Sequence, residues 1–220
     1  MIEPKEIIKS KRKTIALVID QNGELIVRAP LYASKRDVMV FVEEKQKWVR
    51  EKSLQMKERL KETPDLEYND GDEILYLGKA CKIRRGSFKQ FHFDGDTFWI
   101  PNEKDPEKLI IQWYKNAAAG LIKPRVEEIA LTMGDEYTGI RITSAKTRWG
   151  SCSFDNHLNF SWHLMMCPRS VIDYVIVHEL SHIRHKDHSR DFWKRVSKYD
   201  SHYEQHDRWL KDHQRLMEIL

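Results

Sequence analysis

The sequence is poor in cysteine and has no long apolar run. Only 3 of 220 residues are cysteine, and none forms a CxxC pair, which argues against a disulfide framework or a cysteine zinc site. No apolar stretch approaches the roughly 18 residues that span a bilayer, and the N-terminus lacks the apolar segment of a secretory signal. We therefore expect a cytoplasmic protein that has no membrane partner.

Glycine and proline are also scarce, and no stretch has the composition of a flexible linker. The formal net charge is only +4, from 38 Lys and Arg against 34 Asp and Glu. The whole excess falls within residues 1–50, where Lys9, Lys11, Arg12 and Lys13 form a basic arm. We interpret the arm chiefly as a solvated segment, with nucleic-acid binding as the minority interpretation.

Local patterns predict alternating runs of strands and helices. Apolar alternation around Asn22-Gly23 predicts a β-hairpin over 13–30. Asp105-Pro106 is typical of a helix start, although Pro124 is expected to kink or split the helix that follows. The remaining elements expected are helices over 36–60, 106–133, 169–185 and 203–218, and strands within 73–100, 140–145 and 158–163.

This order of elements favours the α+β class, because strands and helices occur in segregated runs. We expect a β-rich N-terminal region over 1–104 and a helical, metal-binding catalytic region over 105–220. The two regions would form either two domains or one continuous domain.

The sequence H-E-L-S-H at 178–182 is the main chemical signal. His178 and His182 lie four residues apart, so a helix places both on one face. This is the H-E-x-x-H pattern, in which two histidines bind zinc and the glutamate is the general base. The alternative is that these residues occur together by chance on a solvent-exposed helix. The apolar flanks of the motif argue against it, since a buried Glu179 without a partner would be costly.

A catalytic zinc site usually takes a third protein ligand. His185 would lie about 10 Å along the helix axis from His178, so these imidazoles cannot converge on one ion. His188 can do so if the helix ends around residues 185–187. The other candidates are His202, Glu204 and His206, of which Glu204 would be a carboxylate on a following helix. Such sites also accept divalent metals other than Zn²⁺.

Several motifs in order resemble the YgjP-like (DUF45) group of zinc metallopeptidases, which is related to SprT-like and minigluzincin-type zincins. They are R-W-G-S-C-S at 148–153, L-N-F-S-W-H-L at 158–164, I-D-Y-V-I-V-H-E-L-S-H at 172–182 and H-S-R-D-F-W at 188–193. The resemblance spans about 12–215. It implies a zincin-like core, namely a small sheet with an active-site helix and a C-terminal helix, behind an N-terminal β-rich extension. It also implies His188 as the third ligand.

These residues predict a zinc-dependent metallohydrolase that acts on a peptide or small-molecule substrate. The metal would lower the pKa of its bound water to about 7, and Glu179 would take the proton. The candidates for contacting the substrate or the transition state are Arg148, His185, His202 and Tyr203, with His206 as a further candidate. Asp173, Asp187 and Asp191 are candidates for orienting a ligand histidine.

Two other functions remain open at this stage. The first is hydrolysis of a nucleotide phosphoanhydride, with Lys146, Arg148 or Arg184 binding phosphate. The second is a non-catalytic zinc module associated with nucleic acid. The presence of Glu179 argues against the second function, because a structural zinc site needs no base. In the segment 148–152 we expect Gly150 to make a tight turn.

Overall fold

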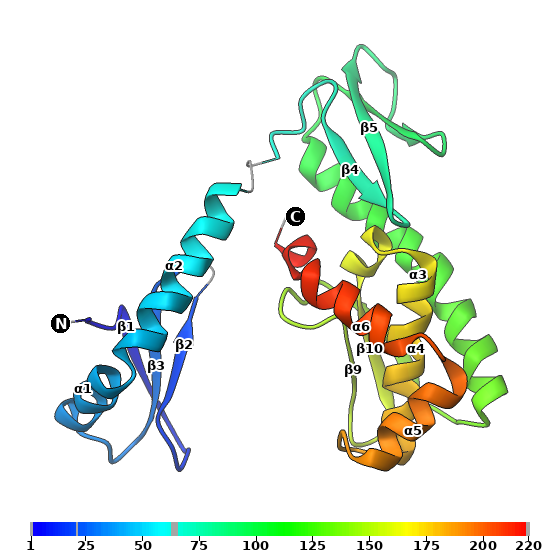
Figure 1. Cartoon of the computed structure of the whole chain (residues 1–220). Coiled ribbons are helices and arrows are strands. Elements are labelled where there is room, and N and C mark those ends of the chain that lie inside the picture. Colours follow the sequence, from blue (N-terminus) through cyan, green and yellow to red (C-terminus); the bar gives the residue numbers. More distant parts are fainter. Residues whose placement is uncertain (1, 21, 63–65, 219–220) are drawn as a thin grey trace. The chain divides into compact units, whose positions relative to one another are not determined.

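The computed structural model describes residues 2–20, 22–62 and 66–218, with the backbone alone for 57–62 (Figure 1). The chain divides into two compact units, Met1–Asp65 and Leu66–Leu220. Helices and strands are both present, grouped in small sheets and helical layers, so the predicted α+β class is confirmed. Among the described residues, no helix combines the length and the apolar character needed to cross a membrane.

The N-terminal unit is a three-stranded sheet packed against two helices. In the order β1-β3-β2, β1 runs parallel and β2 antiparallel to β3, and the predicted hairpin turns at Gly23, whose φ is 75°. The helix predicted over 36–60 is interrupted at Lys45, which ends one helix before the next begins. The elements are β1 (Glu6–Ser10), β2 (Ala16–Ile19), β3 (Leu25–Pro30), α1 (Lys35–Glu44) and α2 (Gln46–Glu62).

The second unit begins with a four-stranded sheet in the order β4-β5-β7-β6. Its buried residues Ile83, Phe98 and Ile100 belong to the same core cluster as Ile110 and Tyr114 of the following helix. This shared core places the unit boundary at residue 65, well before the boundary expected near residue 104. The strands are β4 (Glu73–Tyr76), β5 (Lys79–Gly86), β6 (His92–Phe93) and β7 (Thr97–Pro101).

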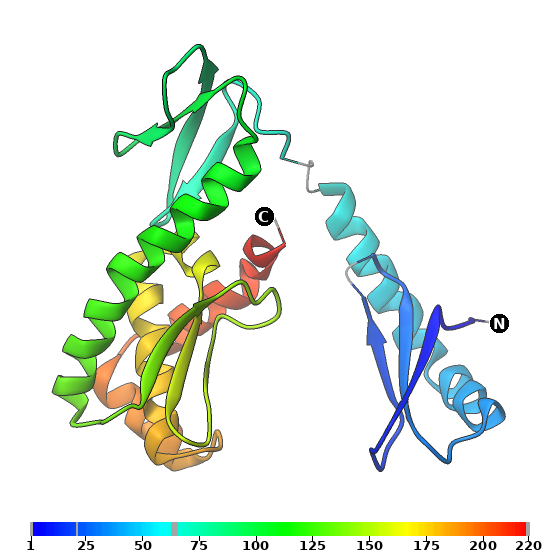
Figure 2. The ribbon, with the colours of Figure 1, turned by 180° about the vertical axis from the view of Figure 1, so that it is seen from behind.

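Helix α3 (Pro106–Met133) runs along the second unit from the β4–β7 sheet to the second sheet (Figure 2). Asp105 caps its start, since its side chain accepts the N–H of Lys108, and Gly134 ends it in the left-handed region. The helix continues through Pro124, contrary to the expected kink or split. It packs on η1 (Trp162–Met166), α4 (Arg169–Arg184) and β8 (Gly139–Thr143).

The second sheet has the order β8-β10-β9, so among the described strands β9 (Gly150–Cys152) is an edge strand that pairs with β10 (His157–Ser161). Helix α4 packs against β9, and α5 (Arg190–Tyr199) and α6 (Tyr203–Asp212) pack on α4. The expected helix over 203–218 is α6 followed by the 3-10 helix η2 (Gln214–Met217). Helix α5 is an addition to the predicted elements.

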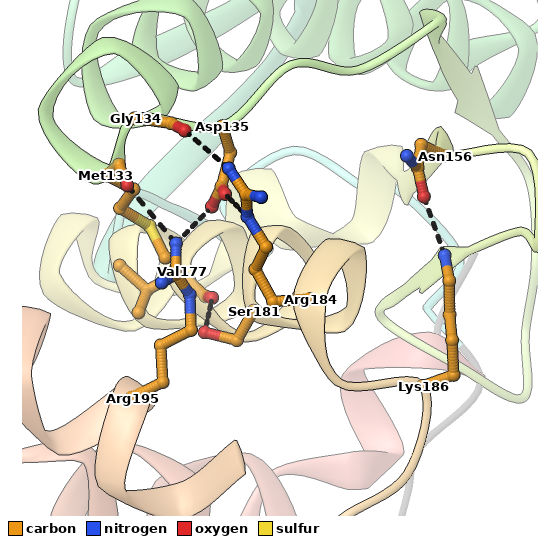
Figure 3. Close-up of polar contacts among 9 residues, drawn as sticks. All are labelled: Met133, Gly134, Asp135, Asn156, Val177, Ser181, Arg184, Lys186 and Arg195. Carbon is orange, nitrogen blue, oxygen red and sulfur yellow. Dashed lines mark hydrogen bonds and ion pairs between the residues drawn. The ribbon is translucent and has the colours of Figure 1, made fainter. Parts of the chain in front are cut away.

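A buried carboxylate joins α3, α4 and α5. The Asp135 side chain has no exposed surface and accepts hydrogen bonds from Arg184 Nε at 2.9 Å and Arg195 Nη2 at 2.6 Å (Figure 3). The same guanidinium groups also donate to the carbonyl oxygens of Gly134 and Met133. The end of α3 is thereby fastened to the last residue of α4 and to the middle of α5.

Replacing Asp135 should therefore destabilise the fold. We expect Asp135→Asn to lower the free energy of unfolding by about 2–3 kcal/mol, because two charge-assisted hydrogen bonds lose their anion. Urea denaturation measures the loss. The matched control is Glu136→Gln, an exposed neighbour, for which we expect a change within about 0.5 kcal/mol. Equal stabilities of the two variants would contradict a role for the buried carboxylate.

Candidate metal centre

Three histidines converge at the end of α4. His178 and His182 lie one helical turn apart, with ring centroids 5.0 Å from each other. Helix α4 ends at Arg184, and His185 is its C-cap in an extended conformation, so the chain leaves the helix axis as predicted. The chain then returns, and Nε2 of His188 lies 3.1 Å from Nε2 of His178.

The donor atoms lie close enough together to be candidate ligands of one metal ion. One ring nitrogen from each of His178, His182 and His188 lies within 4.8 Å of the other two. Zn–N bonds of about 2.0–2.1 Å at tetrahedral angles place the nitrogens about 3.3 Å apart. The 3.1 Å separation of the two Nε2 atoms is close to that value.

The remaining ring nitrogens favour the same orientation. Nδ1 of His182 lies 2.9 Å from the carbonyl oxygen of His185 and must donate to it, which leaves Nε2 free as a ligand. Nδ1 of His178 is buried without a hydrogen-bond partner among the described residues. Burial lowers the pKa of His178 to about 4, and the repulsion that protonated His182 or His188 would exert adds to this effect. Burial also lowers the pKa of His182, so both rings are neutral, the form that binds metal, at neutral pH.

Aromatic side chains hold the third histidine in place. Phe192, which is fully buried, packs its ring 4.8 Å from that of His188 and 4.5 Å from that of His182. Trp193 stacks on His188 with ring centroids 5.8 Å apart. Phe192 is thus a core residue at the His188 turn, as expected from the sequence, whereas Trp193 is partly buried and packs against that core.

Glu179 lies against the edge strand β9. It is 6 % exposed, and its carboxylate accepts the backbone N–H of Cys152. Burial raises the pKa of Glu179 to about 8, opposed by the Cys152 hydrogen bond and by the positive charge of Arg148. A cation bound beside this carboxyl group would favour its ionised form, which is the form that accepts a proton.

Gly150 makes this approach possible. A Cβ atom at this position would lie 2.7 Å from both Cγ and Oε1 of Glu179, closer than real Cβ contacts come. Gly150 belongs to strand β9, so the tight turn expected there is wrong. The glycine is required by the closeness of the Glu179 side chain to the strand.

A cavity of about 280 Å³ opens beside His178 and Glu179. Its lining comes from the start of β9 and the residue before it, from α4, from α6 and from η2. The other lining residues are Trp149, Gly150, Tyr174, Val175, Asp207, Leu210, Lys211 and Gln214. The cavity gives a substrate room next to the candidate base.

Lys186 fastens the loop that carries His188. Its Nζ donates to Oδ1 of Asn156 at 2.7 Å (Figure 3). The same nitrogen donates to the carbonyl oxygen of Ser153 at 2.9 Å and lies 3.7 Å from Sγ of Cys152. These three residues belong to β9 and its turn into β10. The strand that touches Glu179 is therefore tied to the loop that positions the third histidine.

Other predicted residues lie outside the histidine cluster. His185 contributes its carbonyl oxygen to His182, and His202 precedes α6, where its ring contacts the Ser201 hydroxyl. Tyr203 stacks on Trp193, and its hydroxyl donates to the carboxylate of Glu204. Glu204 is not part of the cluster formed by His178, His182 and His188. His206 pairs with Asp200 at 2.7 Å.

The charged candidates have other surroundings. Arg148 is exposed and lines a separate cavity of about 260 Å³, although its charge acts on Glu179. Asp173 forms a bidentate pair with Arg125, at 2.8 and 2.9 Å. Asp187 accepts the N–H of Ser189. Among the described residues, Asp191 forms no hydrogen bond or ion pair with a ligand histidine.

Asp207 is a site residue that the sequence analysis did not single out. It lines the cavity together with His178, its negative charge acts to raise the pKa of that histidine, and its Oδ1 lies 3.4 Å from the Tyr174 hydroxyl. The helical periodicity of α6 gives no signal that one of its many charged residues turns towards α4.

We expect Lys186→Met to weaken zinc binding about tenfold, because the loop that carries His188 loses its anchor. Competition with a chromophoric chelator measures the affinity, and thermal unfolding of the apo-protein should stay nearly unchanged, since Lys186 is exposed. The control is Lys194→Met, an exposed lysine on α5 for which no side-chain hydrogen bond is found in the described chain. Equal zinc affinities for the two variants would show that the anchor is dispensable.

Comparison with known proteins gives one family and two related structures. The zymogen of Pyrococcus abyssi abylysin, a metallopeptidase, is 20% identical and covers 42% of this chain and 94% of its own, with a TM-score of 0.38. The metallopeptidase zymogen jannalysin of Methanocaldococcus jannaschii is 29% identical, with 43% and 96% covered and a TM-score of 0.38. A search of curated proteins gives no match. The model of the YgjP-like, metallopeptidase domain matches residues 13–213, so the chain belongs to the YgjP-like metallopeptidase family.

Proposed function

We propose that this chain is a zinc-dependent peptidase in which His178, His182 and His188 hold the metal and Glu179 is the general base. The convergence of three imidazole nitrogens within 4.8 Å, beside a buried glutamate, carries the proposal. Three nitrogen ligands with an open fourth position are typical of catalytic zinc, although such a site also accepts other divalent ions.

Glu179, Cys152 and Gly150 have distinct roles in the proposed reaction. When bound, zinc acidifies water and polarises a carbonyl group. Glu179 removes the proton from the attacking water and is placed to return it to the leaving amine. The Cys152 N–H orients the Glu179 carboxylate, and Gly150 leaves the room in which that carboxylate lies.

The free edge of β9 supports a peptide substrate. The carbonyl oxygen of Trp149 and the N–H of Ser153 bond to β10, so the backbone groups of Gly150 and Cys152 alternate to the outer side. Cys152 uses its N–H on Glu179, while no hydrogen bond to the outer groups of Gly150 is found in the described part of the chain, so an extended chain could pair with them. A peptide added at this edge would pass the candidate base.

The surroundings of the cations favour a peptide over a nucleotide phosphoanhydride. Arg184 is engaged by Asp135 and the Gly134 carbonyl, so it is not available to bind phosphate beside the histidines. Arg148 lines a cavity whose lining includes neither His178 nor Glu179. Lys146 is exposed and lines neither of these two cavities.

Two substitutions test the site. We expect Glu179→Gln to keep its full zinc content and to lose peptide hydrolysis by at least about a hundredfold, because the proton acceptor is removed. We expect His188→Ala to lose zinc, and His202→Ala, the control, to keep both zinc and activity. Elemental analysis and a screen over peptides and nucleoside triphosphates give the measurements.

Each outcome of this screen has a distinct meaning. Hydrolysis of triphosphates alone, abolished by Glu179→Gln, would replace the peptide substrate and retain the metal site. Full zinc content in His188→Ala would overturn the proposed ligand set.

Gly150→Ala tests the contact between β9 and the base. The added methyl group displaces the Glu179 carboxylate, so we expect kcat to fall about tenfold or more while zinc content stays at the wild-type level. Gly120→Ala is the control, because a Cβ atom there meets nothing within 4 Å. An unchanged kcat in Gly150→Ala would contradict the proposal that Glu179 acts as the base from its position against β9.

A further inference from the structure

One end of the N-terminal sheet gathers positive charge. Strand β1 ends at Ser10, opposite Pro30 at the end of β3, so the connections that follow these strands leave the same end of the sheet (Figure 1). The hydroxyl of Tyr32 donates to the carbonyl oxygen of Lys13 at 3.3 Å and joins the two connections. We call this end the basic tip, which consists of Lys11, Arg12, Lys13, Leu31, Tyr32, Lys35 and Arg36.

The charges of the basic tip have little compensation. Within the described ranges no ion pair involves its five cations, whereas Lys5 of the same unit pairs with Asp20 and Glu24. The nearby carboxylate of Asp37 bonds to Ser34 in the capping box of α1. Lys35 and Arg36 stand in the first turn of that helix, where the helix dipole already adds positive potential. An anion is therefore strongly favoured at this end.

The excess charge belongs to this unit alone. Residues 1–65 carry 15 Lys and Arg against 11 Asp and Glu, whereas residues 66–220 carry 23 of each. The unit that contains the candidate metal centre is thus neutral by formal charge. Attraction of a polyanion would come chiefly from the N-terminal unit.

Apolar side chains lie among these cations. Tyr32 is 80% exposed and Leu31 is 58% exposed, next to one another in the turn after β3. An exposed aromatic ring within a group of lysines and arginines suits a ligand that offers both phosphates and flat bases. Insertion into a bilayer requires a longer apolar face than these two side chains provide.

We propose that the basic tip binds single-stranded nucleic acid, with phosphates on its lysines and arginines and a base stacked on Tyr32. A single strand is favoured over a duplex because its bases are free to stack on a side chain. The proposal concerns the N-terminal unit and is independent of the metal centre.

The test is fluorescence anisotropy of the full chain with labelled 12-nucleotide oligo(U) RNA and oligo(dT) DNA at several salt concentrations. For four to five phosphate contacts we expect log affinity to fall against log salt with a slope of about −3. The triple variant Lys11→Gln, Arg12→Gln, Lys13→Gln should reduce the magnitude of this slope by about 2. Tyr32→Ala should weaken binding about tenfold with the slope unchanged.

A second triple variant controls for total charge. Lys45→Gln, Lys47→Gln, Lys52→Gln removes the same charge from exposed positions further along the helices, and we expect nearly wild-type affinity and slope. Equal losses in the two triple variants would overturn the proposed location. Unchanged binding by Tyr32→Ala would overturn the stacking contact. Binding to vesicles of anionic phosphatidylglycerol without binding to either oligonucleotide would overturn the choice of ligand. Circular dichroism checks that each variant is folded.

Discussion

A straight helix can offer a metal ion two histidines but not three, and the region around the candidate centre is arranged to meet this constraint. His178 and His182 lie on one face of α4, and the next residue of the same heptad face would be too far along the axis to join them. The helix therefore ends at Arg184, the carbonyl oxygen of its cap residue His185 fixes the ring of His182, and His188 returns from the loop. The end of the helix is as much a part of the site as the ligands.

The loop that carries His188 is short and exposed, so its position depends on contacts outside it. Before the loop, Arg184 bonds to the buried Asp135, and after the loop Arg195 bonds to the same carboxylate. Within the loop, Lys186 bonds to the hairpin that contains β9. Charge-assisted hydrogen bonds at these three points offset the conformational entropy that the loop loses when it becomes ordered.

The sequence predicts those parts of the structure whose causes are local. Asp105 and Pro106 mark the start of α3, Asn22-Gly23 marks the hairpin, and the i, i+4 spacing of His178 and His182 places them on one face. Local patterns do not predict the features that depend on contacts between distant parts of the chain. The unit boundary at residue 65 follows from packing of β5 and β7 on α3, and the need for glycine at position 150 follows from Glu179. No local pattern predicts the role of Asp135, because its partners Arg184 and Arg195 lie 49 and 60 residues later in the chain.

Two ion pairs join α3 and the segment after it to α4, and their spacing sets the register of the two helices. Arg125 pairs with Asp173 near the start of α4, and Asp135 pairs with Arg184 at its end. The partners are ten residues apart along the first segment and eleven along the second, in the same direction, so the two lengths are nearly equal. His178 and His182 lie between the two pairs. One residue inserted in α4 between them would advance one pair by about 1.5 Å and rotate it by about 100°. The two ion pairs thus fix the length of α4 between Asp173 and Arg184. None of the four paired residues is a candidate metal ligand.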